Sequence, residues 1–475
     1  MSIPILWQDP FSNKQSSLFI PIYFSSLGEG EKLVIKECLK EFGIYIEFSK
    51  LLFDYARFLK VLYIDQLAND VMEWMSFKLN KLELLDYDSR ANPLITLLFK
   101  LFLENGAILH EFGLYHYEYL KFELEIFHSL EQNVQFFSRL QHLSLNIKLN
   151  NAIENIAKLL RVLAKNTKKI SALELIFYSK YESKLFHILF PALIHFIKSQ
   201  EQLRKFILDV RDDCPTEFYG IISALESQNN TLQEVILDGC VFSTEFEVLN
   251  NCKNLETLRI LYCDTKLLKI LDYNISTLEI SYSQFDVPII VQILEKIGIS
   301  LQRLKIQSGM IILEESLLLE AIKSFCPNII YLYIADFGLS TQLIELIGNL
   351  QKLQFLSLGS DYHASKGVRK ILVMQFAKIL PSTLEYLDIV LGVLYGLLEP
   401  FIDILLDLCN APLKKLLISG GKHNSEKNTK ALIRYCTRIR TLNYVGIVKN
   451  YDYDIRNELE KYVTLVPYDD IVVDC

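Results

Sequence analysis

The residue types that most often carry catalysis occur in this sequence without the spacings that catalysis needs. The eight histidines form no HExxH pair, and none belongs to a CxxC-type cluster. Segment 420–422 (GGK) lacks the upstream glycine and the following Ser or Thr of a phosphate-binding loop. The aspartates at 212–213 and 469–470 are adjacent in the chain rather than facing, which does not suit paired acid and base catalysis. These patterns predict a protein that is not an enzyme and uses no cofactor or metal.

A second set of side chains suits binding. Aromatic and basic residues recur at corresponding places in successive segments of the second half of the chain. Such residues dominate the strongest contacts of protein interfaces because they give a large contact area at modest entropic cost. The alternative is that tyrosine is common here only because it suits β-strands. We predict that a target-binding surface is formed by Arg259, Tyr262, Tyr282, Arg303, Lys305, Tyr331, Tyr333, Phe355 and Tyr386.

A repeated motif sets the spacing of this set. The pattern LxxLxL, in which L is any aliphatic residue and x is variable, returns twelve times. One copy is expected by chance in a leucine-rich chain, but twelve copies at a mean spacing of about 27 residues are typical of leucine-rich repeats. The copies begin at Leu140, Ile170, Leu203, Leu232, Leu255, Ile275, Leu301, Ile329, Leu353, Leu384, Leu413 and Ile439.

Each copy predicts a short strand followed by a helix. The last two aliphatic residues of the motif alternate with variable ones, as in a strand with one buried face. The following segment ESLLLEAIKSFCPN has apolar residues at helical spacing, and Pro327 ends that helix. One strand and one helix cannot close a core alone, so neighbouring repeats must stack. The sequence therefore predicts an α/β leucine-rich-repeat solenoid, a horseshoe with a concave parallel sheet, convex helices and a helical N-terminal cap.

The same register predicts which strand residues are buried. The aliphatic positions Leu258, Leu304, Leu332, Leu356 and Leu387 should be fully buried. The variable residue between the last two aliphatic ones should face the concave side. A repeat protein that reads nucleic acid would show a basic or stacking regularity in this column. The column is instead mixed, and consists of Ser144, Glu174, Ile207, Ile236, Arg259, Glu279, Lys305, Tyr333, Ser357, Asp388, Leu417 and Asn443.

The cysteines fit the repeat. Cys240 and Cys263 each lie three residues after the last aliphatic residue of a copy, where the repeat consensus has Asn or Cys. Cys252, Cys326 and Cys436 each lie three residues before the next copy. Metal or redox chemistry is the alternative for these thiols. Packing already explains their spacing, and we favour it.

The chain before Leu140 is less regular. FLKVLYI from Phe58, LNKLEL from Leu79 and YEYLKFEL from Tyr117 are weaker copies of the motif, and segments 33–44 and 71–82 have a helical period. We therefore divide the chain into a helical cap with the remnant of a further module at 1–57, degenerate leucine-rich repeats at 58–139, and a leucine-rich-repeat solenoid at 140–475. Terminal repeats are usually atypical because one face must meet water.

Composition narrows the class of partner. Hydrophobic residues form 51% of the 475 residues, which is enough for a core throughout the chain. The net charge of −8 argues against general binding to nucleic acid or anionic membranes, since both need a basic surface. The most apolar windows reach only about half the length of a bilayer span. Scattered cysteines and the lack of a signal peptide predict a cytoplasmic or nuclear protein.

The N-terminal segment IPILWQDPF, followed by FLKVLYI at Phe58 and by irregular repeats with a CPNIIYL junction, resembles the fungal F-box/leucine-rich-repeat proteins. The resemblance covers nearly the whole chain. It implies that Ile5, Leu6 and Trp7 are the adaptor side, from the last helix of an F-box-like module whose first helices are largely missing. It also implies a substrate-recognition subunit of a Skp-cullin-F-box ubiquitin ligase. The Skp adaptor and cullin would bind the N-terminal module if the F-box is complete, and a target protein would bind the concave face.

Two other functions fit the same residues. A stand-alone protein-interaction scaffold would bind targets without recruiting a ligase, and IPILWQDPF would then be only an apolar cap on the first repeat. A GTPase-activating leucine-rich-repeat protein would need one exposed arginine on which stimulated nucleotide hydrolysis depends.

Overall fold

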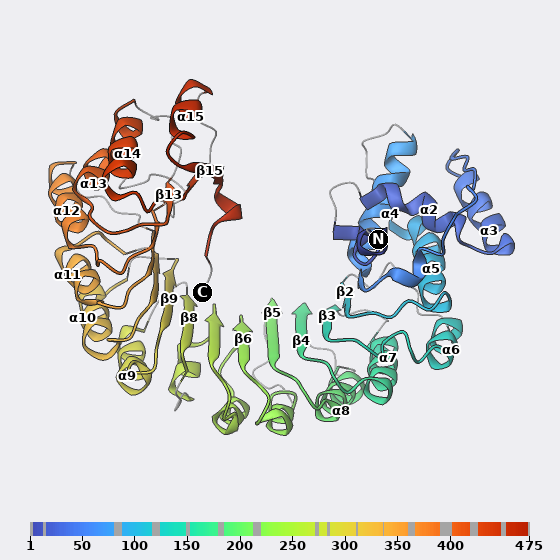
Figure 1. The fold of residues 1–475 in the computed structure, drawn as a ribbon. Coiled ribbons are helices and arrows are strands. Elements are labelled where there is room, and N and C mark those ends of the chain that lie inside the picture. Colours follow the sequence, from blue (N-terminus) through green and yellow to red (C-terminus); the bar gives the residue numbers. More distant parts are fainter. Residues whose placement is uncertain are drawn as a thin grey trace. The chain divides into compact units, whose positions relative to one another are not determined.

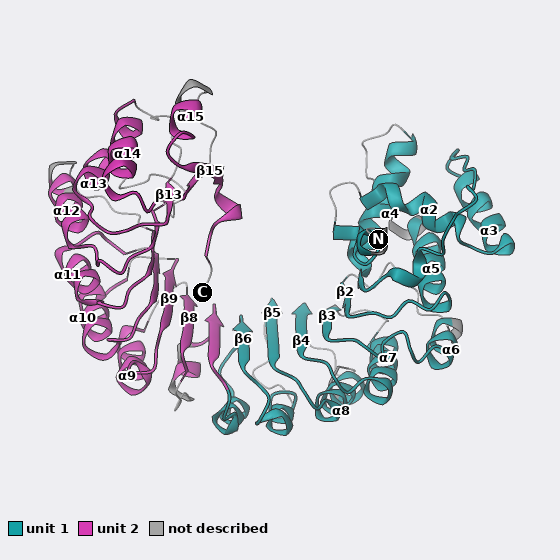
Figure 2. Cartoon of the chain, in the orientation of Figure 1, with its two compact units in different colours: residues 1–254 teal, residues 255–475 magenta. Residues whose placement is uncertain are grey.

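The structure is a computed structural model of the 475-residue chain, which forms two compact units, residues 1–254 and residues 255–475 (Figure 2). It describes residues 3–12, 16–79, 88–115, 124–148, 153–178, 185–211, 220–270, 275–282, 286–309, 312–335, 337–359, 366–389, 401–418, 426–447 and 453–473.

Unit 1 begins with a mostly helical region, which extends beyond the predicted cap at residues 1–57. Its helices are α1 (Ile3–Leu6), α2 (Ile20–Ser25), α3 (Glu29–Lys40), α4 (Ile64–Leu79) and α5 (Asp88–Glu104), with 3-10 turns at Pro10–Ser12, Ser16–Phe19 and Ala56–Phe58 (Figure 1). Helix α3 starts where the Gly28 N–H donates to the Glu31 carboxylate at 3.1 Å, a pairing that satisfies one of the amide groups at a helix start. The helical periods predicted at 33–44 and 71–82 thus correspond to α3 and to the end of α4, and residues 80–82 lie outside the described part.

The rest of unit 1 alternates strands with helical segments. The described strands pair in parallel and in chain order, each beside the next: β1 (Val61–Tyr63), β2 (Glu111–Leu114), β3 (His142–Lys148), β4 (Ala172–Tyr178), β5 (Lys205–Arg211) and β6 (Glu234–Asp238). The segments between them lie on one side of the sheet (Figure 1): α6 (Leu124–Gln132), α7 (Ile153–Asn166), a π-helical turn (Leu185–Leu189), α8 (Phe190–Ser199), and 3-10 turns at Ser223–Gln228 and Thr244–Asn251.

Unit 2 repeats the same arrangement. Its described strands also pair in parallel and in chain order: β7 (Thr257–Leu261), β8 (Thr277–Tyr282), β9 (Arg303–Ser308), β10 (Tyr331–Ala335), β11 (Phe355–Gly359), β12 (Tyr386–Asp388), β13 (Lys415–Ile418), β14 (Tyr444–Ile447) and β15 (Thr464–Pro467). Helical segments again cover one side (Figure 1): a 3-10 turn (Thr265–Ile270), α9 (Val287–Ile297), α10 (Glu315–Phe325), α11 (Thr341–Asn349), α12 (Lys366–Ile379), α13 (Ile402–Leu408), α14 (Glu426–Ile439) and α15 (Tyr453–Leu459), with a last 3-10 turn at Tyr468–Asp470.

The helical segment that covers the sheet differs between repeats. The two shortest repeats run from Leu232 to Leu255 and from Leu255 to Ile275, and the described part of each contains a 3-10 turn instead of an α-helix. The longer repeat from Leu203 to Leu232 also has a 3-10 turn in its described part, at Ser223–Gln228, whereas the repeat from Leu301 to Ile329 contains an α-helix of several turns. A 3-10 segment advances about 2.0 Å per residue against 1.5 Å for an α-helix, so fewer residues span the strand-to-strand return.

The predicted burial is confirmed. Leu258 is 1% exposed, and Leu304, Leu332, Leu356 and Leu387 are completely buried against the helix-bearing side. Strand β9 shows the alternation directly, since Leu304, Ile306 and Ser308 are buried while the residues between them are half-buried. The described strands and their covering helices confirm the predicted α/β leucine-rich-repeat fold.

The predicted register is correct for the pairs that the structure describes, with one exception at the end. Ser144 pairs with Glu174, Lys305 with Tyr333, and Asp388 with Leu417, as the motif requires. Leu417, however, pairs with Gly446 and not with Asn443. Helix α14 continues to Ile439, so this repeat is LNYVGI from Leu442 rather than RIRTLNY from Ile439.

The early repeats differ from the prediction in part. FLKVLYI does form β1, whereas strand β2 falls in the segment LHEFGL, which the motif search missed. Leu109, Phe112 and Leu114 of that segment are completely buried, as a repeat requires. The predicted copies from Leu79 and Tyr117 lie almost entirely within 80–87 and 116–123, outside the described residues.

Backbone hydrogen bonds to one carbonyl per repeat link successive repeats. The residue before a strand accepts two N–H groups from the start of the next strand, as when the Ile330 carbonyl accepts from Gln354 at 2.8 Å and from Phe355 at 3.0 Å. In unit 1 the Lys60 carbonyl accepts from His110 at 2.7 Å and from Glu111 at 3.1 Å in the same way. These bonds join backbone groups, so they set the register of the strands independently of the side chains.

Candidate protein-binding face

Each sheet has an open face, meaning the side opposite its helices. In unit 2 the open face carries three aromatic rings and a guanidinium in line, which we call the aromatic ladder: Arg303, Tyr331, Phe355 and Tyr386. The Arg303 guanidinium lies 4.6 Å from the Tyr331 ring centre. The rings of Tyr331 and Phe355 are 6.4 Å apart, and those of Phe355 and Tyr386 are 5.8 Å apart. Such spacings are within the range of favourable aromatic contacts.

Strand register explains why the ladder forms. Arg303 pairs with Tyr331, Tyr331 with Phe355, and Phe355 with Tyr386, so the four residues are direct neighbours on four adjacent strands. Neighbouring parallel strands lie about 4.8 Å apart, which places flat side chains at stacking distance on one face. The structure thus brings together four of the residues that the sequence predicted for a binding surface.

A charged cluster continues the open face of unit 2 on the neighbouring strands. The Glu279 carboxylate, 5% exposed, lies 2.9 Å from Arg259 and 2.9 Å from Lys305. The Lys305 ammonium lies 5.0 Å from the centre of the Tyr333 ring, and the Tyr333 hydroxyl lies 3.5 Å from the side-chain oxygen of Gln307. Two predicted cations are therefore held by a carboxylate that the sequence analysis placed in the same column.

The C-terminal segment, residues 468–473, lies across the aromatic ladder. The Tyr331 hydroxyl donates to the Val473 carbonyl at 3.1 Å, and the Val473 N–H donates to the Tyr386 hydroxyl at 3.2 Å. The Tyr468 hydroxyl donates to Asp388 at 3.1 Å. Val473 packs with one apolar cluster, which contains Tyr331, Tyr333, Ala335 and Phe355. Ile471 belongs to a second cluster, with Tyr386, Leu417, Phe355, Val466, Tyr468 and Val473.

This segment changes the exposure that the sequence predicted. The tyrosines of this open face were expected to be exposed, yet Tyr331 is completely buried, Tyr386 is 1% exposed and Tyr333, beside the aromatic ladder, is 9% exposed. Burial raises the pKa of the Tyr386 hydroxyl above its ordinary value, and the neighbouring carboxylate of Asp388 adds to the rise. Burial and Asp388 raise the pKa of Tyr468 likewise. These hydroxyls therefore remain protonated hydrogen-bond donors at neutral pH.

Two predicted residues do not join the ladder. Tyr262 lies just after β7 in the left-handed region, with φ of 53°, and is 61% exposed. Tyr282 alternates in phase with Leu278 and Ile280, so it belongs to the helix-bearing side, where it is 4% exposed. The prediction that Tyr282 faces the concave side is therefore wrong. Position 282 is the third in-phase residue of a six-residue strand, and the motif marks only two.

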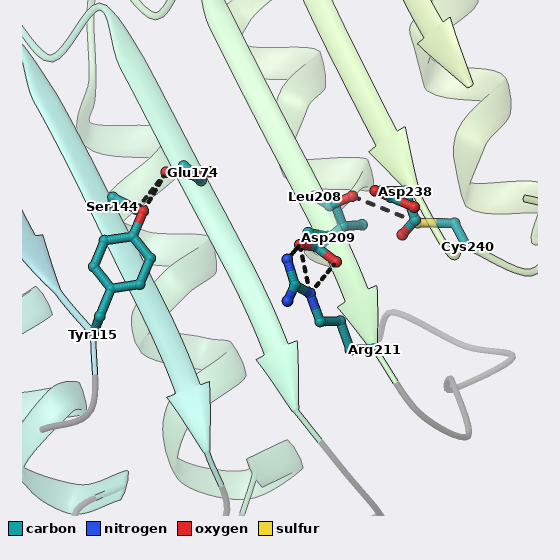
Figure 3. A network of polar contacts seen from close by, with 8 residues as sticks. All are labelled: Tyr115, Ser144, Glu174, Leu208, Asp209, Arg211, Asp238 and Cys240. Carbon is teal, nitrogen blue, oxygen red and sulfur yellow. Dashed lines mark hydrogen bonds and ion pairs between the residues drawn. The ribbon is translucent and has the colours of Figure 1, made fainter. Parts of the chain in front are cut away.

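The open face of unit 1 carries two groups of polar side chains (Figure 3). The oxygens of Tyr115, Ser144 and Glu174 lie within 2.8 Å of one another, and Ser144 is completely buried. Burial raises the pKa of the Tyr115 hydroxyl, so this hydroxyl donates to Glu174 at neutral pH. The mixed column predicted Ser144 and Glu174 as neighbours, but Tyr115 was missed because β2 was not recognised.

A pair of aspartates belongs to the second polar group on the open face of unit 1. Asp209 and Asp238 are paired on β5 and β6, and the Arg211 side chain donates to Asp209 at 3.0 Å (Figure 3). Burial, followed by the charge of Asp209, raises the pKa of Asp238 to about 6. Cys240, next to this pair, directs its Sγ toward the Leu208 and Asp238 carbonyls.

The predicted adaptor-side residues differ in exposure. Ile5 is 69% exposed and Leu6 is 50% exposed, whereas Trp7 is 5% exposed. The Trp7 ring stacks on Tyr55 at 4.2 Å and meets Phe19 edge-on at 4.9 Å. Trp7 is therefore a core residue of the cap, and the surface available to a partner consists of Ile5 and Leu6.

Cys240, Cys252, Cys263 and Cys326 lie at the repeat positions that their spacing predicted, whereas Cys436 lies within α14, six residues before the copy that begins at Leu442. Six of the seven described cysteines are buried, Cys240, Cys252, Cys263 and Cys326 among them. Burial raises the pKa of Cys326 to about 12, which keeps the thiol protonated and unreactive. In the part of the chain that the structure describes, no three His, Cys, Asp or Glu side chains gather as a metal site would require.

Comparisons with known proteins support no named family. No family model matches the sequence, and no curated protein matches it either. Solved structures with some similarity include Rad7 in its complex with Elc1 from yeast, at 15% identity and a TM-score of 0.38, covering 71% of this chain and 80% of that chain. LegL7 from Legionella pneumophila has 12% identity and a TM-score of 0.33 over 70% and 92% of the two chains. A protein from Bacteroides fragilis has 13% identity and a TM-score of 0.28 over 70% and 76%.

The repeats and the sheet define the class of this protein. Short parallel strands with buried leucines in register, each followed by a helical segment on one side, make the chain a leucine-rich-repeat protein. Among the described residues, no helix is both long enough and apolar enough to cross a membrane.

Proposed function

We propose that this leucine-rich-repeat protein binds a target protein on the open face of unit 2. The aromatic ladder carries this proposal. Arg303, Tyr331, Phe355 and Tyr386 form a continuous row of the residue types that dominate interface energetics. The row is built on strands, which hold binding residues more rigidly than loops do.

The finer proposal is that the protein is the substrate-recognition subunit of a Skp-cullin-F-box ubiquitin ligase. The resemblance of IPILWQDPF to the end of an F-box-like module supports it, together with Ile5 and Leu6 at the surface of a cap anchored by Trp7. The ubiquitin chemistry would belong to other subunits. A stand-alone interaction scaffold is the second candidate, and the core position of Trp7 fits that function equally well.

Adaptor binding separates the two candidates. A purified Skp-type adaptor is titrated by calorimetry into the full chain, into a variant with Ile5→Asp and Leu6→Asp, and into the control Leu33→Asp with Val34→Asp. Leu33 is 58% and Val34 is 46% exposed on α3 of the same cap, so the control matches the double variant in added charge and closely in exposure. The ligase proposal expects binding that the double variant weakens at least about tenfold and the control retains. Lack of adaptor binding by the unaltered chain would remove the ligase subunit and leave the scaffold.

Target binding is tested with a displayed peptide library selected on the purified chain and on a variant whose C-terminal segment carries Ile471→Asp and Val473→Asp. The selected peptides are then measured against Phe355→Ala, with Ile207→Ala on the open face of unit 1 as the control. Specific peptides should lose at least about tenfold in affinity on Phe355→Ala and nothing on the control. Equal binding to both variants, or no selected peptide at all, would reject the open face of unit 2 as the binding site.

A further inference from the structure

The C-terminal segment contacts the open face of unit 2 as a bound peptide does. Both backbone polar groups of Val473 are satisfied by ladder tyrosines, through the hydroxyls of Tyr331 and Tyr386. These partners lie 142 and 87 residues away in the sequence. Hydrogen bonds to a backbone N–H and carbonyl contribute to binding whatever the side chain is, as in peptide-binding domains.

Side-chain contacts add selectivity at three positions of the segment. Tyr468 donates its hydroxyl to Asp388, Ile471 is 8% exposed in one apolar cluster, and Val473 packs in the other. The intervening Asp469, Asp470 and Val472 are exposed. The open face is therefore complementary to the pattern Tyr-x-x-Ile-x-Val, in which an aromatic hydroxyl is followed by aliphatic side chains three and five residues later.

The open face has room prepared for this segment. Gly446 on β14 is the open-face neighbour of Leu417, at a position where the other strands of unit 2 carry a side chain. A Cβ added at Gly446 would lie 3.1 Å from the side chain of Ile471 and 3.0 Å from that of Leu417. Contacts of 3.0 to 3.1 Å are tighter than ordinary carbon packing, so the absence of a side chain at 446 lets Ile471 lie against the sheet.

We propose that residues 468–473 are an internal occupant of the target site, and that the target is a peptide segment with the Tyr-x-x-Ile-x-Val pattern, its Tyr at the start of a 3-10 turn as in residues 468–470, that binds by displacing them. This inference rests on the proposed function and adds the chemistry of the ligand and a regulation of the site. An occupant on the same chain competes at a high effective concentration. If it covers the site about 99% of the time, it weakens the apparent affinity for the target about a hundredfold.

The test uses the full chain and a fluorescein-labelled synthetic peptide with the sequence YDDIVV, which copies residues 468–473. Fluorescence anisotropy gives the affinity for the unaltered chain, for Ile471→Asp with Val473→Asp, and for the control Val472→Asp. Val472 is 41% exposed, so the control adds one negative charge to the segment outside the contact, against two within the contact for the double variant. The double variant should bind the peptide at least about tenfold more tightly than the unaltered chain, and the control should bind as the unaltered chain does. A peptide with aspartate at the Ile and Val positions should bind none of them.

A second variant tests the sheet side of the site. Gly446→Phe fills the space that Ile471 occupies, and the labelled peptide would place its own Ile there, so Gly446→Phe added to the double variant should weaken peptide binding at least about tenfold relative to the double variant alone. Thermal unfolding of each variant shows whether unit 2 remains folded. Hydrogen exchange tests the displacement on the unaltered chain itself. Added peptide should increase the exchange of the backbone amides at 471–473, because it displaces the segment.

The outcomes separate this inference from the proposed function. Equal peptide affinity for the unaltered chain and the double variant, with unchanged exchange at 471–473, would overturn the internal occupant. If library-selected peptides still depend on Phe355 in that case, target binding stands and only the occupant is rejected. If no chain binds either YDDIVV or any selected peptide, both are rejected.

Discussion

The backbone carbonyl of Gln8 accepts a hydrogen bond from the N–H of Lys60 at 2.8 Å, and a second from Val61 at 3.1 Å. This is the same pair of bonds that the carbonyl of Lys60 forms with the start of the next repeat. Gln8 therefore occupies the place of the residue before a preceding strand, and IPILWQDPF pairs with the start of β1 at the first edge of the unit 1 sheet.

The first prediction concerns Trp7, whose ring lies in the cap core on Tyr55 and Phe19. Trp7→Ala should lower the free energy of unfolding of unit 1 by about 3–5 kcal/mol, because a large buried ring is lost and a cavity remains. Leu6→Ala, at a residue that is 50% exposed, should cost less than about 1 kcal/mol. Denaturant unfolding with hydrogen exchange on residues 16–79 measures both. Equal effects would mean that Trp7 is not an anchor.

The second prediction tests the register of the repeats. Leu304 is completely buried on β9, so Leu304→Ala should cost about 2–5 kcal/mol of unfolding free energy. Leu313, which follows the same strand, is 73% exposed, and Leu313→Ala should change stability by about 0.5 kcal/mol or less. Chemical denaturation of the two variants compares them. A similar small loss at both positions would contradict the register.

The sequence predicted the strands well wherever aliphatic residues filled the motif. A buried strand face admits only apolar residues at alternate positions, so the pattern fixes both the strand and its phase. It failed at β2 because Phe112 takes the place of an aliphatic residue in LHEFGL. It failed at β14 because Ile439 and Leu442 both begin a plausible motif, and only the length of α14 decides between them.

The site was predictable only in part, for a different reason. Neighbouring residues of the aromatic ladder follow from the repeat, because equivalent positions on adjacent strands must be neighbours. The covering of that ladder depends on a segment 87 to 142 residues away, and no periodic pattern links Val473 to Tyr331 or Tyr386. The available signal was Gly446 in an otherwise apolar strand, together with the aliphatic run IVV at 471–473.

The third prediction concerns the carboxylate between two cations on the open face of unit 2. Glu279→Gln should destabilise unit 2 by about 1–3 kcal/mol, because it removes charge-assisted contacts to Arg259 and Lys305 and leaves the two cations facing each other. The matched control is Glu320→Gln, where a 65% exposed side chain lies 3.6 Å from Lys323. That change should cost about 0.5 kcal/mol or less. Thermal unfolding of both variants measures the two losses of stability. An equal loss in the control would contradict the prediction.

The fourth prediction concerns Asp70, which is 6% exposed on α4 and accepts a hydrogen bond from Ser16 at 2.5 Å. Burial raises the pKa of its carboxyl from 3.8 to about 6, against the lowering effect of the Ser16 hydroxyl. Because the folded state holds this proton more tightly than the unfolded state, the stability it contributes is full below about pH 4. That contribution is lost as the pH rises from about 4 through 6.

Replacing the carboxyl should remove this dependence. Asp70→Asn cannot ionise, so at pH 7 it should be more stable than the unaltered chain, by up to about 3 kcal/mol from the gap between the two pKa values. The advantage should shrink to about 0.5 kcal/mol near pH 4, where the carboxyl is protonated in the folded state and about half protonated in the unfolded state. The control Glu29→Gln, at a 92% exposed side chain, should track the unaltered chain throughout. Unfolding measured from pH 4 to 7 compares the three, and an Asp70→Asn chain that is less stable at pH 7 would show that the ionised carboxylate stabilises the cap instead.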